Sequence, residues 1–146
     1  MKKAVLLFLV LCGTTLMAQD WQPSWEVVTK TSETTNKPIL LVFSGSDWCA
    51  PCIKLDRDIW STQVFQAFAK DHLVLYKADF PRRKANQLPE PLATQNKQLA
   101  SQFNAKGYFP LVVLLSTKKE VLGQTAYLNI SPEEYTNKLK AMVANE

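Results

Sequence analysis

Two of the three cysteines in this 146-residue chain stand close together, at Cys49 and Cys52. The segment that holds them reads S-G-S-D-W-C-A-P-C-I-K-L-D, so Ala50 and Pro51 separate the two thiols. Thiols at this spacing can form a structural disulfide, supply half of a metal site, or form a redox centre that exchanges disulfides with other molecules. Which of these chemistries applies depends on the rest of the sequence.

The first two chemistries find little support in the chain. A disulfide across two residues constrains little of the unfolded chain, so it would stabilise the fold weakly. Tetrahedral zinc needs a second pair of ligands, and the chain offers only His72, which stands beside Asp71 as a typical surface residue. Haem attachment would need histidine at position 53, which is Ile53. We therefore expect no metal and no separate cofactor, and we favour a redox-active disulfide.

The sequence around the pair predicts where each sulfur lies. The apolar run 39–43 is typical of a central strand buried on both faces, and the residues after Cys49 predict a helix. Unpaired N–H groups and the helix dipole favour negative charge at a helix N-terminus, so Cys49 should ionise readily and act as the nucleophile. Cys52 follows one turn later, where it can resolve a disulfide formed by Cys49. Pro51 suits the first turn of that helix.

Helical and strand patterns alternate along the chain. Helices are predicted from Trp25 to about Asn36, from Cys49, over 62–69 with Ser61 as N-cap, and over 92–104. A last helix is predicted from Ser131, which forms a capping box with Glu134, and Pro132 suits its first position. Strands are predicted over 39–43, 73–78, 111–115 and 120–128. This order indicates an α/β fold, with a central mixed sheet flanked by helices on both faces.

The N-terminus has the pattern of an export signal. Lys2 and Lys3 form a short basic region, 4–11 is apolar but too short to span a bilayer, and Ala18 is a small residue suited to cleavage. We expect a signal peptide over 1–18, a single domain over 19–146, and a periplasmic location. Lipid attachment through Cys12 is the less favoured alternative.

Charge and composition limit the classes of partner. The formal net charge is +4, and two of those charges leave with the signal. Basic residues cluster only at Arg82-Arg83-Lys84, which is typical of a solvated loop, so nucleic acid is not an expected partner. We expect a monomer that reacts with protein thiols or disulfides and with an electron donor or acceptor that the sequence does not identify.

Over residues 25–144 the chain resembles the thioredoxin family. The resemblance rests on the strand 39–43, the segment W-C-A-P-C at 48–52, Lys77 and Asp79 at the end of the next strand, G-Y-F-P at 107–110, and the closing hairpin and helix. The segments G-S-D-W-C and D-F-P-R, at 45–49 and 79–82, resemble exported thioredoxin-like proteins common in Bacteroidetes. The resemblance implies a thioredoxin fold and thiol-disulfide oxidoreductase activity. It also implies a cis peptide bond between Phe109 and Pro110. The substrate groove that it implies is lined by Trp48, Ala50, Pro51, Phe109 and Pro110.

Three departures from the family pattern bear on function. Thioredoxins bury an acid where this chain has Phe43, so the proton of Cys52 would need another route, through water, Asp47 or Lys77. Ala50 replaces the usual glycine, which leaves the direction of electron flow open. The loop 80–91 is longer than the equivalent loop in thioredoxin. It could form a surface for a specific partner, but we favour the interpretation that it is a tolerated insertion. The alternative function is a redox-inactive binding or assembly module of the same fold, able to carry a metal ion transiently.

Overall fold

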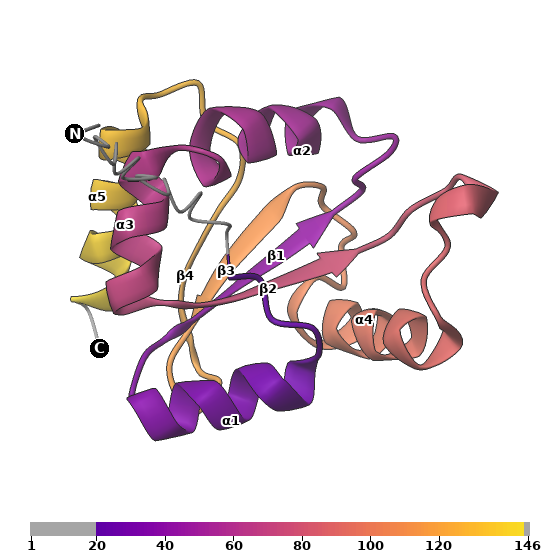
Figure 1. The fold of residues 1–146 in the computed structure, drawn as a ribbon, viewed down its shortest axis with the longest axis horizontal. Helices are drawn as coiled ribbons and strands as arrows, with labels where there is room; N and C mark the ends of the chain where they lie inside the picture. The colour runs from indigo at the N-terminus through magenta and orange to yellow at the C-terminus, as the bar shows by residue number, and fades with distance from the viewer. Residues whose placement is uncertain (1–19, 145–146) are drawn as a thin grey trace, which may run out of the picture.

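A four-stranded sheet lies at the centre of the computed structural model, which describes residues 20–144 (Figure 1). Its strands are β1 (Ile39–Ser44), β2 (Val74–Asp79), β3 (Leu111–Leu115) and β4 (Val121–Thr125). The spatial order is β2-β1-β3-β4, with β1 parallel to β2 and antiparallel to β3. The predicted mixed sheet is confirmed.

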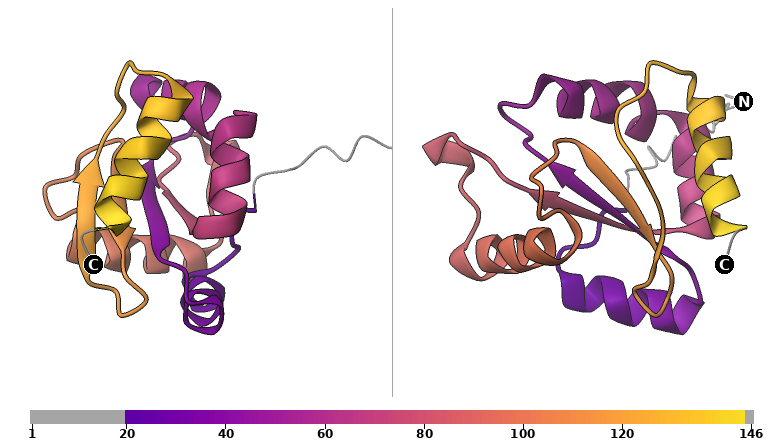
Figure 2. Two further views of the ribbon diagram at one scale, coloured as in Figure 1. Left: turned by 90° about the vertical axis from the view of Figure 1, so that its left-hand side faces the viewer. Right: turned by 180° about the vertical axis from the view of Figure 1, so that it is seen from behind.

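Helices cover both faces of the sheet, as the sequence predicts. One face carries α1 (Trp25–Thr35) and α4 (Glu90–Phe103), and the other carries α2 (Ala50–Leu55), α3 (Gln63–His72) and α5 (Pro132–Val143) (Figures 1 and 2). A π-helical turn, η1 (Asp56–Trp60), continues α2, and a short 3-10 helix, η2 (Lys84–Asn86), interrupts the loop after β2. No helix within residues 20–144 is long and apolar enough to cross a membrane.

The alternation of side chains along β1 builds two hydrophobic layers. Leu40 and Val42 pack beneath α2, α3 and α5 with the fully buried rings of Trp60 and Tyr135. On the opposite face, the alternate β1 residues pack against α1 and α4; they are Ile39, Leu41 and Phe43. Full burial of each such side chain contributes about 1.5–3 kcal/mol. The strand that leads to the cysteines is therefore firmly fixed.

Three predicted element ends are wrong by a few residues. The N-cap of α3 is Thr62, whose hydroxyl accepts a hydrogen bond from the Phe65 N–H, and not Ser61. β4 ends at Thr125, because its pairing with β3 ends at Val112. α4 begins at Glu90, since Pro89 serves as its N-cap. The capping box at Ser131 and Glu134 is confirmed.

Candidate active site

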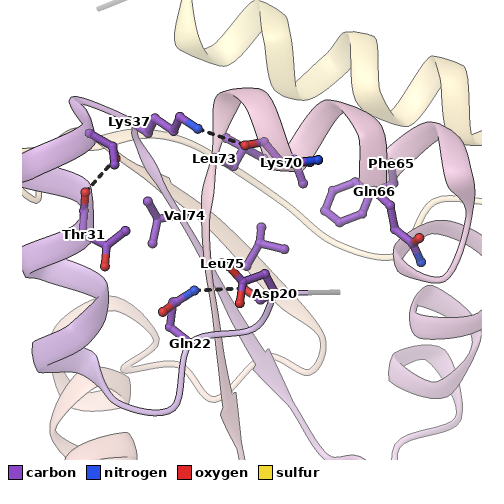
Figure 3. Close-up of a pocket in the computed structure, with 12 residues that line it drawn as sticks. Asp20, Gln22, Thr31, Lys37, Phe65, Gln66, Lys70, Leu73, Val74 and Leu75 are labelled. Carbon is purple, nitrogen blue, oxygen red and sulfur yellow. Dashed lines mark hydrogen bonds between the residues drawn. The ribbon is translucent and has the colours of Figure 1, made fainter. Parts of the chain in front are cut away.

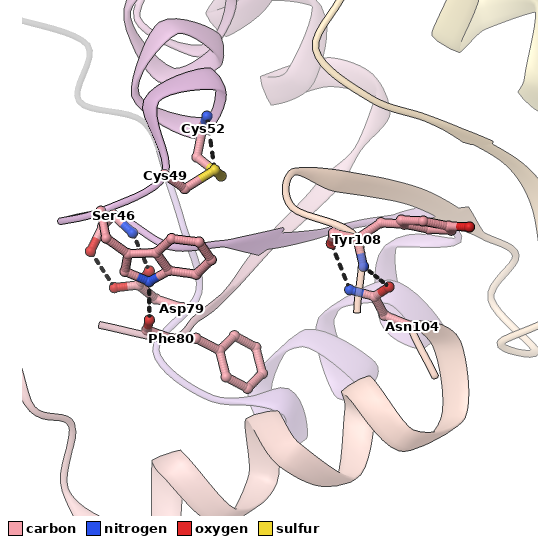
Figure 4. Close-up of a disulfide and its surroundings, with 8 residues drawn as sticks. Ser46, Cys49, Cys52, Asp79, Phe80, Asn104 and Tyr108 are labelled. Atoms are coloured by element: carbon pink, nitrogen blue, oxygen red, sulfur yellow. Dashed lines mark hydrogen bonds between the residues drawn. A yellow bond between two sulfur atoms is a disulfide. The ribbon is translucent and has the colours of Figure 1, made fainter. Parts of the chain in front are cut away.

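The loop from β1 to α2 holds both cysteines. Cys49 is the N-cap of α2, where its sulfur accepts a hydrogen bond from the Cys52 N–H at 3.3 Å, and Pro51 lies in the first turn. The two sulfurs are joined in a disulfide (Figure 4). This placement at the helix N-terminus confirms the position predicted for the pair.

The two cysteines are equally buried in the disulfide form. Each is only 4% exposed, so burial does not distinguish the two residues. Ala50 and Pro51 between them are exposed. What distinguishes the two sulfurs is therefore their place on α2, since Cys49 precedes the first turn and Cys52 belongs to it.

Trp48 is fixed on several sides next to Cys49. Its indole N–H donates to the Phe80 carbonyl at 2.7 Å, and its ring meets Phe109 edge-on, with 5.4 Å between ring centroids. The Arg82 guanidinium lies 3.8 Å from the centroid of the indole. Gly45 packs directly against the same indole, in a place that a Cβ atom would not fit. Trp48 is thus an immobilised wall beside the disulfide.

The segments G-S-D-W-C and D-F-P-R contact each other through several hydrogen bonds. Asp79, the last residue of β2, accepts hydrogen bonds from the Ser46 N–H at 2.9 Å and the Ser46 hydroxyl at 2.6 Å (Figure 4). The Phe80 N–H donates to the Ser44 carbonyl at 2.8 Å. Sequence reasoning missed the Ser46–Asp79 pair. The signal was available, because residues that follow two parallel neighbouring strands emerge at one edge of a sheet.

Asp47, predicted as a possible proton-transfer group, faces the loop after β2. Its carboxylate accepts hydrogen bonds from the Arg82 N–H at 2.9 Å, the Arg83 N–H at 3.0 Å and the Asn86 side-chain amide at 3.0 Å. The Arg82 N–H, followed by the Asn86 amide, lowers the pKa of Asp47 below its usual value, because these donors stabilise the anion. Asp47 is therefore arranged as an anchor for this loop.

Lys77, the other predicted proton-transfer group, forms a salt bridge on the α2 side of the sheet. Its ammonium lies 2.6 Å from an Asp56 carboxylate oxygen and 4.7 Å from the centroid of Trp21. The Asp56 N–H donates to the Cys52 carbonyl, so Asp56 stands one helical turn after Cys52 on the same side of the helix. Phe43 is fully buried on the opposite face. Asp56 was not among the residues predicted for proton transfer.

The segment before β3 supplies the facing side of the site. The Phe109–Pro110 peptide bond is cis, as the resemblance implied, and Pro110 is buried. The Asn104 amide donates to the Tyr108 carbonyl at 2.8 Å and accepts from the Tyr108 N–H at 2.9 Å (Figure 4). Because Phe109 contacts Trp48, the structure brings the predicted groove residues of both loops together. Asn104, which is 5% exposed, was not predicted.

Two features lie apart from the cysteines. A pocket of about 390 Å³ opens near the start of β2, and its walls include Leu75, Lys37 and Phe65 but neither cysteine (Figure 3). His72 is exposed and stacks on Phe68. Among residues 20–144 no group of three or more His, Cys, Asp or Glu side chains is arranged to hold a metal ion.

Comparisons with known proteins agree with this geometry. Residues 20–117 match the model of a family described as thioredoxin-like. The chain is 32% identical over 122 residues to the disulfide bond reductase DsbH of Chlamydia pneumoniae, covering 84% of this chain and 71% of that protein. A solved structure named DsbH oxidoreductase superposes with a TM-score of 0.79 at 31% identity, covering 85% of this chain and 83% of that one. A thioredoxin from Thermus thermophilus, 15% identical with a TM-score of 0.63, shares the fold and covers 84% of this chain and 85% of its own.

Proposed function

The chain belongs to the thioredoxin-like family and is a thiol-disulfide oxidoreductase, and we propose that it exchanges disulfides with exported proteins through Cys49 and Cys52. The observation that carries this proposal is the placement of Cys49 as N-cap of α2, with Cys52 in the first turn behind it. A helix N-terminus stabilises a thiolate, and the thiolate is the reactive form of cysteine.

The proposed reaction has two steps. In the reduced protein, the Cys49 thiolate attacks one sulfur of a substrate disulfide, forms a mixed disulfide and expels the other substrate sulfur as a thiolate. The Cys52 thiolate then attacks the Cys49 sulfur, which releases the second substrate thiolate and closes the Cys49–Cys52 disulfide. Two electrons pass from the dithiol to the substrate, and water supplies the protons that the released thiolates take up. The reverse sequence oxidises a substrate dithiol.

We favour the reducing direction and an exported location for this chain. The direction is supported by the relative named disulfide bond reductase, which is 32% identical. The location is supported by the signal-like pattern of residues 1–18, which lie outside the residues that the structure describes. Narrower kinship with the Bacteroidetes proteins remains a prediction from the segments at 45–49 and 79–82.

The groove and the proton route complete the proposal. A substrate chain would contact exposed Ala50 and Pro51 on one side and the segment 108–110 on the other, with Trp48 between them. Backbone groups next to a cis proline can pair with an extended peptide. For the proton of Cys52, we assign the Asp56–Lys77 pair, because Asp47 is engaged by the loop after β2 and Asp56 lies one turn from Cys52.

Trapping of covalent intermediates tests the roles of the two sulfurs. Cys52→Ser should accumulate mixed disulfides with partner proteins, because the second attack is lost, whereas Cys49→Ser should accumulate few or none. Each variant is expressed with its export signal, and complexes are read on non-reducing gels before and after dithiothreitol. Equal trapping by both variants would contradict the assigned roles.

Insulin reduction by dithiothreitol provides the matching activity assay. The wild-type protein should accelerate insulin precipitation, and Cys49→Ser should not. Absence of acceleration by the wild-type protein, together with absence of trapping by Cys52→Ser, would refute the proposed function.

A further inference from the structure

The loop after β2 is attached to the active-site loop instead of lying free in solvent. Three donors from Arg82, Arg83 and Asn86 converge on the Asp47 carboxylate, and the Phe80 carbonyl accepts the indole N–H of Trp48. A tolerated insertion would not need these contacts. The segment 80–86 therefore has a defined position next to the cysteines.

This attachment orients the Arg82 side chain. Its guanidinium lies 3.8 Å from the centroid of the Trp48 indole, and Trp48 directly precedes Cys49. A guanidinium stacked on an aromatic ring keeps its N–H donors at the rim of the plane, where they can pair with a carboxylate. Arg82 is exposed, and within the described residues its guanidinium takes part in no salt bridge and no side-chain hydrogen bond.

The charge beside Arg82 is also positive. Arg83 and Lys84 are exposed, and neither forms a salt bridge in the part of the chain that the structure describes. The carboxylates of the two contacting loops are already engaged, since Asp79 accepts from Ser46 and Asp47 accepts from the loop itself. Three consecutive exposed residues, Arg82, Arg83 and Lys84, thus carry positive charge, and we call them the cationic rim.

We propose that the cationic rim selects protein disulfides that carry acidic side chains close to the reactive cysteine. This inference rests on the proposed function. A carboxylate on the substrate pairs with the Arg82 guanidinium while the substrate disulfide approaches the Cys49 thiolate. Charges at the edge of an interface act mainly on the rate of encounter. The rim should therefore raise the second-order rate constant of the first attack and leave the later attack by Cys52 unaffected.

Two matched disulfide peptides test this selectivity. Both peptides contain one intramolecular disulfide and have the same length, and the residues flanking the cysteines are glutamate in one peptide and glutamine in the other. The reduced full-length protein is mixed with each peptide, with dithiothreitol as the electron donor for turnover. At low ionic strength the wild-type protein should react about threefold to tenfold faster with the glutamate peptide, a factor that should shrink at high salt.

Variants assign the preference to the rim. Arg82→Gln should bring the two rate constants close to each other, whereas Arg82→Lys, which keeps the charge without the planar donors, should retain part of the difference. Lys30→Gln removes one exposed charge from α1, on the opposite face of the sheet from α2, and should keep the wild-type ratio. If Arg82→Gln does not fold, Arg83→Gln combined with Lys84→Gln tests the charge of the same loop and should lower the ratio.

The outcomes separate this inference from the proposed function. Equal rates for both peptides with the wild-type protein, or a ratio that Arg82→Gln leaves unchanged, would overturn the selectivity while the oxidoreductase activity stands. If neither peptide is reduced, the proposed function fails. In that case, the role of the rim is decided by a binding measurement. Versions of both peptides with serine in place of cysteine are titrated into the oxidised protein, and binding is monitored by tryptophan fluorescence. Tighter binding of the glutamate peptide supports it, and equal binding overturns it.

Discussion

Substitution of Gly45 by alanine tests how closely the active-site loop is packed. Gly45 follows β1, and its carbonyl accepts hydrogen bonds from the N–H groups of Trp48 and Cys49. A Cβ atom at position 45 would lie 2.3 Å from Cε2 and 2.5 Å from Nε1 of the Trp48 indole, far inside contact distance. The indole is held by the Phe80 carbonyl, the Phe109 ring and the Arg82 guanidinium. Gly45→Ala must therefore displace the indole or the loop.

The cost of that displacement can be bounded. Overpacking in a well-packed region costs about 1–3 kcal/mol, and loss of the hydrogen bond from the indole to Phe80 adds about 0.5–1.5 kcal/mol. We expect Gly45→Ala to lower the free energy of unfolding by about 1.5–4.5 kcal/mol, measured by urea denaturation of the oxidised protein. Insulin reduction should also slow, because Trp48 adjoins Cys49.

A double-mutant cycle with Trp48 separates the clash from other effects. In a Trp48→Ala background the methyl group meets no indole, so Gly45→Ala should cost less than about 0.5 kcal/mol. Gly107→Ala is the control, since Gly107 has a φ of 70° with no atom near its Cβ position. It should cost about 1–2 kcal/mol from backbone strain in either background. An equal cost of Gly45→Ala in both backgrounds would refute the packing argument.

Three further substitutions have distinct expected results. The pKa of Asp47 is lowered in the folded state, so the stability that its carboxylate contributes is complete above the usual pKa of 3.8 and is lost as the pH falls through the lower folded pKa. Asp47→Asn should remove this part of the pH dependence of urea unfolding. At neutral pH, the same variant should expose the loop after β2 to faster trypsin cleavage. Asn104→Ala should lower the free energy of unfolding by about 1–3 kcal/mol and slow insulin reduction, because the Tyr108 backbone loses two hydrogen bonds next to the cis peptide bond. Unchanged stability would contradict a role of Asn104 in holding this segment. Ser131→Ala removes the N-cap of α5 and should cost about 0.5–2 kcal/mol with no change in exchange rate, so a slower rate would argue against a purely structural cap.

Short-range chemistry was readable from the sequence alone. The continuous apolar run at 39–43 predicted a strand that is fully buried in the structure, since only an interior strand needs apolar residues on both faces. Cys49 was predicted at the start of a helix and serves as its N-cap, because capping and the tolerance for Pro51 depend on neighbours within one turn. The cis bond at Phe109–Pro110 was predicted from the family resemblance and is confirmed.

Only the tertiary structure decided which distant groups meet. The parallel register of β1 and β2 sets Ser44 opposite Asp79, so the loops that follow these strands emerge side by side. Because of that juxtaposition, Asp47 binds Arg82 and Asn86, which follow it in the chain by 35 and 39 positions. The same juxtaposition stacks the Arg82 guanidinium on the Trp48 indole. Lys77 likewise pairs with Asp56, which precedes it by 21 residues in the chain. Such contacts depend on which strands pair and in which register, which no local pattern around the cysteines contains.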